Sequence, residues 1–132
     1  MRVLVVEDEW LVALEMRLIL EDLGHEVVGI APDSRRAREI AAKGIDVALV
    51  DLNLRDGLTG PAIGADLVEQ GATVLFMTAN PAQLGPGVPG AVGVLAKPVE
   101  HDELKQTAHF VEALRFGRSP PPPPSRLRQF AA

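Results

Sequence analysis

The sequence contains no cysteine, which excludes a disulfide framework, a thiolate metal site and a cysteine nucleophile. It also lacks a long hydrophobic run: the apolar stretch nearest the N-terminus, residues 3–6, is too short for a membrane span or a signal-peptide core. The net charge of −5 and the absence of a basic patch with interleaved aromatic residues argue against nonspecific nucleic-acid binding. We therefore expect a cytoplasmic protein with no nucleic-acid partner and no membrane insertion.

The 132 residues are enough for one domain with a buried core. Short apolar runs, rich in β-branched residues, alternate with segments whose apolar residues recur at helical spacing. This alternation predicts an α/β fold in which helices cover both faces of a parallel sheet. The expected strands are residues 3–6, 27–30, 47–50, 73–77 and 92–96, and the expected helices are residues 10–23, 34–43, 61–70 and 100–116.

Two stretches depart from this alternation. Residues 79–91 hold three prolines and three glycines, so we expect a short or irregular segment instead of a full fourth helix. Residues 120–124 are consecutive prolines, which favour a stiff polyproline II conformation. We interpret residues 1–116 as the domain and residues 117–132 as a proline-rich flexible tail, acting as a spacer or, alternatively, as a ligand for a proline-binding domain.

The predicted strands end on residues with site chemistry, and the carboxyl ends of parallel strands share one edge of a sheet. Glu7 and Asp8 follow the first strand, Asp51 the third, Thr78 the fourth and Lys97 the fifth. Crowded carboxylates repel one another, and a hard divalent cation such as Mg²⁺ relieves that repulsion. With an ammonium and a hydroxyl beside them, they predict a pocket for an anion next to a metal, in which a carboxylate can act as a nucleophile and form an aspartyl phosphate. Singly, each residue is as well explained as a helix cap or a solvated charge.

Four short motifs resemble the receiver domain of bacterial two-component response regulators, in its stand-alone, chemotaxis-regulator-like form. The likeness covers residues 1–116 and implies a flavodoxin-like, doubly wound, five-stranded parallel sheet of order 2-1-3-4-5. The motifs are VLVVEDE at residues 3–9, VDLNL at 50–54, FMTA at 76–79 and KPV at 97–99.

The resemblance implies a role for each acidic residue. Asp51 matches the phosphoacceptor, which takes a phosphoryl group from a histidine kinase or a histidine phosphotransfer protein. Asp8 and Asp51 match Mg²⁺ ligands, together with the backbone carbonyl of Asn53, and Glu7 matches a residue that acts through water.

The remaining matched positions surround the phosphoryl group. Lys97 matches the residue that pairs with the phosphoryl oxygens, and its bond to Pro98 is expected to be cis. Thr78 matches the hydroxyl that moves toward the phosphate, and Ala79 leaves access beside it. Asn80, like Asn53, matches a variable position that affects how long the phosphate lasts.

The chain departs from the family pattern at Val94, where an aromatic residue is usual three positions before the lysine. An aromatic side chain moving inward therefore cannot report the phosphoryl state. The segment between Thr78 and Lys97 is also shortened and rich in glycine and proline, so the usual output helix is altered.

These observations favour a single-domain response regulator that signals by contact with a downstream protein partner or by phosphorelay. We expect it not to be an enzyme, beyond catalysing its own phosphorylation and dephosphorylation. One alternative is a pseudo-receiver that docks partners without being phosphorylated, which Val94 favours. Another is a Mg²⁺-dependent phosphatase that uses Asp51 as a transient nucleophile. A nucleotide-binding flavodoxin relative is disfavoured, because the loop after the first strand carries acids where a phosphate cradle needs glycines.

Overall fold

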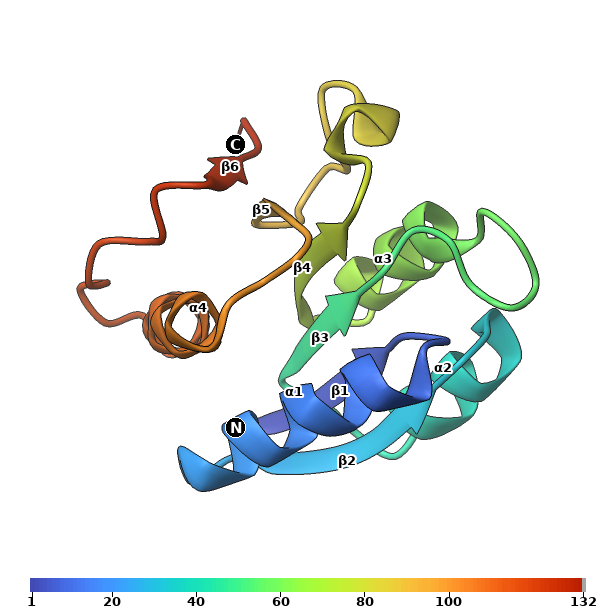
Figure 1. The fold of residues 1–132 in the computed structure, drawn as a ribbon, viewed down its shortest axis with the longest axis horizontal. Coiled ribbons are helices and arrows are strands. Elements are labelled where there is room, and N and C mark those ends of the chain that lie inside the picture. The colour runs from blue at the N-terminus through green and yellow to red at the C-terminus, as the bar shows by residue number, and fades with distance from the viewer. Residues whose placement is uncertain (132) are drawn as a thin grey trace.

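A computed structural model describes residues 1–131 as a sheet between two layers of helices (Figure 1). The strands β1 (Arg2–Val6), β2 (Glu26–Ala31), β3 (Val47–Val50), β4 (Thr73–Thr78) and β5 (Gly93–Ala96) are parallel. Their order, β2-β1-β3-β4-β5, confirms the predicted topology. A sixth strand, β6 (Leu127–Gln129), extends the sheet by pairing antiparallel with β5.

The central strands are buried on both faces, which explains their continuous apolar sequence. Every residue of β3 is buried, and so is β4 after its first residue. The register aligns the strand ends, because Val6 pairs with Val50, Val50 with Phe76, and Thr78 with Ala96. The residues that follow β1, β3 and β5 are therefore delivered to one edge of the sheet.

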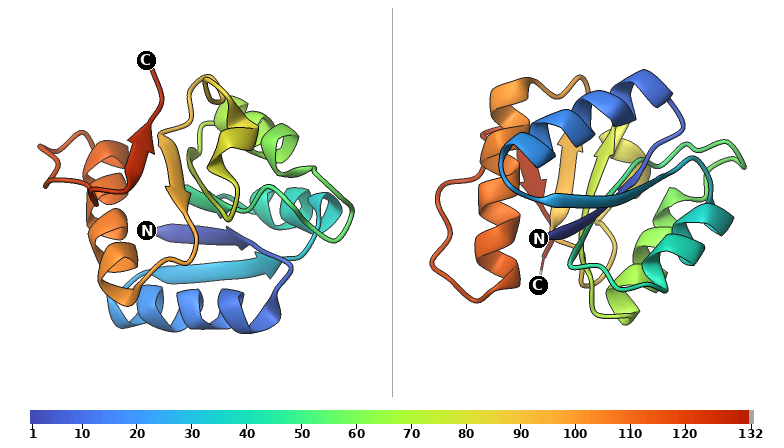
Figure 2. Two further views of the ribbon diagram at one scale, coloured as in Figure 1. Left: turned by 45° about the horizontal axis from the view of Figure 1, so that its top comes forward. Right: turned by 90° about the horizontal axis from the view of Figure 1, so that it is seen from below.

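The helices divide between the two faces of the sheet (Figure 2). The helices α1 (Trp10–Asp22) and α4 (His101–Arg115) cover one face, and α2 (Ser34–Ala41) and α3 (Gly60–Glu69) cover the other. All four predicted helices are present, with ends that differ by a few residues. Asp33 is the N-cap of α2, and its side chain accepts a hydrogen bond from the Arg36 amide (2.9 Å).

The segment after β4 forms one short 3₁₀ helix, η1 (Pro81–Leu84), in place of a full helix. This confirms the irregular segment expected from its prolines and glycines. Among residues 1–131, no helix combines the length and the apolar character needed to cross a lipid bilayer.

The C-terminal residues differ from the flexible tail expected from the sequence, because they contain β6. Leu127 packs against the core under α1 and α4, and Phe130 packs against the core under α2 and α3, 6.3 Å from Phe76 between ring centroids. The sequence did not predict this strand, because it follows a run of prolines, has only three residues and pairs with a strand far back in the chain. The division of the chain at residue 117 stays a prediction.

Candidate functional site

Backbone hydrogen bonds hold the strand ends of the candidate site in place. The Asp51 amide donates to the Val6 carbonyl (2.9 Å), so the residue after β3 is tied to the end of β1. The Lys97 amide donates to the Thr78 carbonyl (2.8 Å), so the residue after β5 is tied to the end of β4. The side chains at these positions therefore start from one rigid edge.

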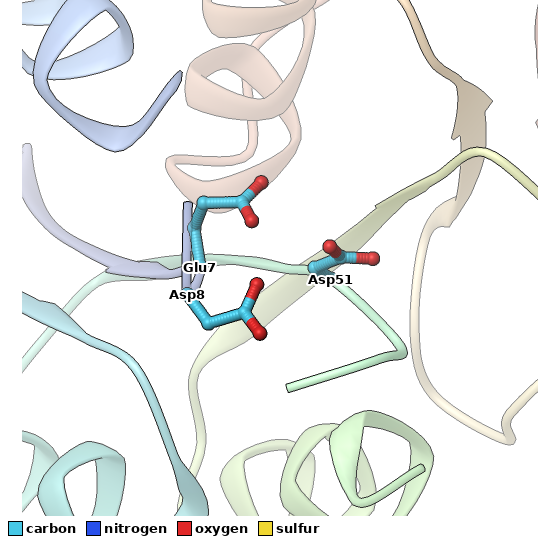
Figure 3. Close-up of side chains that lie close together, drawn as sticks. All are labelled: Glu7, Asp8 and Asp51. Carbon is cyan, nitrogen blue, oxygen red and sulfur yellow. The ribbon is translucent and has the colours of Figure 1, made fainter. Parts of the chain in front are cut away.

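Three carboxylates meet at this edge (Figure 3). Glu7, Asp8 and Asp51 each offer an oxygen atom, and these atoms lie within 4.8 Å of one another. The Glu7 side chain is only 2% exposed and that of Asp51 13%. An all-oxygen, strongly anionic set that opens to solvent at one side suits Mg²⁺, which keeps some of its water when bound to proteins.

Lys97 joins two of these carboxylates. Its ammonium group donates to Asp51 Oδ2 (3.0 Å) and forms a short contact with Glu7 Oε1. Burial lowers the pKa of Lys97, but the hydrogen bonds and attraction from Glu7 and Asp51 outweigh burial and raise the pKa above its ordinary value. The side chain is therefore held as a cation against Asp51.

Burial acts in the opposite sense on the acid. Burial raises the pKa of Glu7, and this effect is larger than the lowering of the pKa by the hydrogen bond and the charge of Lys97. A buried carboxylate of this kind is stabilised by additional positive charge. The site thus has the electrostatic character of one that accepts a cation.

The second Asp51 oxygen is also engaged. Asp51 Oδ1 accepts a hydrogen bond from the Leu52 amide (2.7 Å), so both carboxylate oxygens have a donor. These two bonds orient the carboxylate at the mouth of the site.

Gly60, a residue that sequence reasoning missed, shapes the loop that follows Asp51. It begins α3, and a Cβ atom there would collide with the Asp51 carbonyl oxygen and the Leu52 Cα. The Gly60 amide also donates to the Leu52 carbonyl (3.1 Å). Only a residue without a side chain allows α3 to start this close to the site. Its position directly before Pro61 was the available signal.

The residues after β4 lie on the strand next to Asp51. Thr78 is fully buried, and its hydroxyl accepts a hydrogen bond from the Asn80 amide (3.1 Å). Ala79 and Asn80 are exposed. The Thr78 hydroxyl therefore lies at the end of β4, where it is bonded to the backbone of the following loop.

The two other predicted positions flank the site. Asn53 is exposed, and its side-chain amide lies 3.4 Å from the Gln83 oxygen of η1. The peptide bond between Lys97 and Pro98 is cis, the isomer that the resemblance implied.

A groove of about 410 Å³ adjoins the site between α1 and the chain after β5. Met16, Ala79 and Pro98 are among its lining residues, and Lys97 reaches it as well. The small side chain at position 79 leaves this side of Lys97 accessible.

Comparison with known proteins agrees with this geometry. Residues 3–109 match the family model of the response regulator receiver domain. The phyllosphere-induced regulator PhyR of Methylorubrum extorquens is 34% identical over 121 residues, which are 89% of this chain and 45% of that protein. The chain spans about half the length of the curated relatives it matches.

Solved structures show the same likeness. The receiver domain of Erythrobacter litoralis PhyR aligns with a TM-score of 0.76 and 28% identity, covering 92% of this chain and 94% of that domain. The anti-anti-sigma factor PhyR of Bartonella quintana aligns with a TM-score of 0.69 and 30% identity, covering 88% of this chain and 48% of that one.

Proposed function

The chain belongs to the family of response regulator receiver domains, and we propose on this basis that it is a cytoplasmic phosphoacceptor switch. In this proposal Asp51 accepts a phosphoryl group from the phosphohistidine of a kinase or of a phosphotransfer protein. An Asp51 oxygen forms a bond to phosphorus while the phosphorus–nitrogen bond breaks. The electron pair stays with the imidazole, which takes up a proton.

One observation carries the proposal: Lys97, from the end of β5, contacts Asp51 directly, within a cluster of carboxylates from β1 and β3. Its ammonium is placed to pair with phosphoryl oxygens added to Asp51. A structural ion pair alone would need one acid, whereas Lys97 contacts two, Glu7 and Asp51, and a third carboxylate, Asp8, lies beside them.

Glu7, Asp8 and Asp51 would hold Mg²⁺. When bound, the ion supplies charge neutralisation for the incoming phosphoryl group. The chain itself orients Asp51 through the Leu52 amide and holds Lys97 against it. Thr78 supplies a hydroxyl on the neighbouring strand end.

Phosphorylation adds a charge of about −1.5 to −2 at this edge. We propose that the change in the loops after β4 and β5 is read by a protein partner or passed on by phosphorelay. One relative is described as an anti-anti-sigma factor, so an anti-sigma factor is a concrete class of partner to test.

The proposal is tested by incubating the protein with Mg²⁺ and acetyl phosphate and measuring its intact mass. We expect one phosphoryl group on the wild type, none on Asp51→Asn, and none when Mg²⁺ is chelated. Asp102→Asn, an exposed carboxylate in the first turn of α4, is the matched control and should be phosphorylated normally. Trp10, at the start of α1 and 60% exposed, should report Mg²⁺ binding by its emission.

A pseudo-receiver that docks partners without phosphorylation is the second candidate. Val94 favours it, because this residue is 1% exposed and lacks the ring that could move between two states. A wild-type protein that binds Mg²⁺ but takes no phosphate from any small donor would support this candidate over the first. Steady release of phosphate from small esters would instead indicate a phosphatase.

A further inference from the structure

The C-terminal residues 126–130, which we call the docking segment, contact the loop that carries Lys97. Arg126 forms a two-bond ion pair with the Glu103 carboxylate (2.7 and 2.8 Å). The same guanidinium donates to the carbonyls of Ala96 (3.1 Å) and Pro98 (2.7 Å). These are the residues on either side of Lys97, so one side chain of the docking segment holds the backbone around the site lysine.

A second arginine of the docking segment, Arg128, contacts the other loop beside the site, the chain after Thr78. Arg128 donates to the carbonyls of Gly85 (3.1 Å) and Pro81 (3.3 Å). It also lies over the ring of Phe130, with its guanidinium carbon 5.4 Å from the centroid. Both loops that leave the phosphoacceptor site are therefore tied to the same short strand.

Apolar contacts and one backbone bond complete the attachment. Phe130 packs against Phe76 and over Gly87, where a Cβ atom would collide with the ring. Its amide donates to the Val92 carbonyl (3.0 Å). Figure 2 shows the docking segment lying along β5 beside α4. A strand this short owes its position to these anchors, because three ladder residues contribute little by themselves.

We propose that the docking segment is a ligand of the β5 edge within the same chain, and that its docking weakens when Asp51 carries a phosphoryl group. The proposal rests on the proposed function. The new phosphoryl oxygens attract the Thr78 hydroxyl toward β3, and the Lys97 ammonium, which already contacts Asp51 Oδ2 (3.0 Å), must move to accommodate them. In the order β3-β4-β5-β6 the docking segment lies on the far side of β5 from Asp51. Movement of the two loops from their present positions therefore disturbs the contacts made by Arg126 and Arg128.

Thermodynamic linkage makes the effect reciprocal. If bound beryllofluoride, a phosphoryl analogue, weakens docking by a given factor, then loss of docking must strengthen the binding of beryllofluoride at Asp51 by the same factor. Release also exposes the backbone groups of the β5 edge, which the docking segment covers.

The first test measures amide hydrogen exchange on the full chain with Mg²⁺, with and without beryllofluoride, a phosphoryl analogue. Fluorine NMR reports whether the analogue is bound. We expect the Phe130 amide to exchange at least about fivefold faster in the bound state. Asp51→Asn should show no change. Unchanged or slower exchange with the analogue bound would overturn the proposal.

The second test measures the affinity for beryllofluoride in Arg126→Ala and Arg128→Ala. Both variants should bind the analogue more tightly, and the pair guards against a fold defect in either one. Arg118→Ala is the matched control, since this tail arginine lies over Phe116 (5.5 Å) instead of contacting the loops. Equal affinities in wild type and both variants would contradict the coupling.

The two proposals fail in different ways. If no beryllofluoride binds to the wild type, the phosphoacceptor function fails and the coupling falls with it. If it binds and the Phe130 amide does not respond, only the coupling is overturned.

Discussion

The Lys97 ammonium compensates the most deeply buried acid of the site. Glu7 is almost inaccessible to water, and its contact with Lys97 supplies the positive charge that keeps its ionised form tolerable. An uncompensated buried charge is strongly destabilising, whereas a metal ion can replace the lost cation. The balance of the site therefore depends on this one side chain when Mg²⁺ is not bound.

Lys97→Met should lower the free energy of unfolding by about 2 kcal/mol without Mg²⁺. Saturating Mg²⁺ should recover most of this loss, because it neutralises the same carboxylates. Urea unfolding with and without Mg²⁺ measures both values. Lys105→Met, which changes an exposed lysine of α4, is the control and should alter neither. A loss that Mg²⁺ leaves unchanged would show that Lys97 acts through packing.

Thr107 is a second residue whose chemistry stands out. It is fully buried in α4, and within residues 1–131 its hydroxyl finds no hydrogen-bond partner. A buried polar group without a partner costs about 1–3 kcal/mol.

Thr107→Val keeps the shape of the side chain and removes the hydroxyl. We expect the free energy of unfolding to rise by about 1 kcal/mol, as measured by urea unfolding. Thr107→Ser keeps the hydroxyl, loses the methyl group and should be destabilised. A stability loss in the valine variant would mean that the hydroxyl has a partner in solution.

At the scale of elements, close packing between α3 and β4 depends on a glycine. A Cβ atom at Gly64 would collide with the ring of Phe76, which is fully buried. The small residue lets the helix lie directly over the ring, and the position of α3 in turn sets the loop after Asp51.

Gly64→Ala should therefore destabilise the protein by about 1–3 kcal/mol, despite the better helix propensity of alanine. Thermal unfolding followed by circular dichroism measures the loss. Combining it with Phe76→Leu should cost less than the sum of the two single changes, because the smaller side chain frees the space. Strict additivity would show that the two residues do not interact.

The elements also show where prediction from the sequence ended. The five parallel strands and the four helices follow from apolar periodicity, which is local. The strand β6 does not, because Leu127 and Phe130 pack on opposite faces of the sheet and the segment has too few residues for a pattern. Its stability comes from Glu103 and from the carbonyls around Lys97, which lie far back in the chain.

For the whole molecule, one buried histidine links stability to pH. His25 is 8% exposed, near the N-terminal amine (3.1 Å) and Glu112 (3.9 Å). Burial lowers the pKa of His25, and the N-terminal charge and His109 add to this, while Glu112 opposes it. The unfolded chain therefore takes up a proton at a higher pH than the folded chain does.

The contribution of His25 to stability should consequently be fully present above about pH 6.5, the ordinary pKa of histidine. It should be lost as the pH falls toward the lower pKa that His25 has in the folded chain. The slope from this group is at most about 1.4 kcal/mol per pH unit. Urea unfolding at a series of pH values from 7.5 to about 5 measures it. His25→Gln should flatten the profile, and His101→Gln, an exposed residue of α4, should not. Equal slopes in all three proteins would contradict this assignment.

The sequence by itself determined the layers, the strand order by resemblance, and the set of residues at the strand ends, because burial on both faces imposes continuous apolar runs and parallel strands end together. Only the tertiary structure decided that Lys97 bridges Asp51 and Glu7, that Gly60 must lack a side chain, and that the C-terminal residues pair with the β5 edge. These features depend on contacts between residues far apart in the chain. Periodicity carries no information about such contacts.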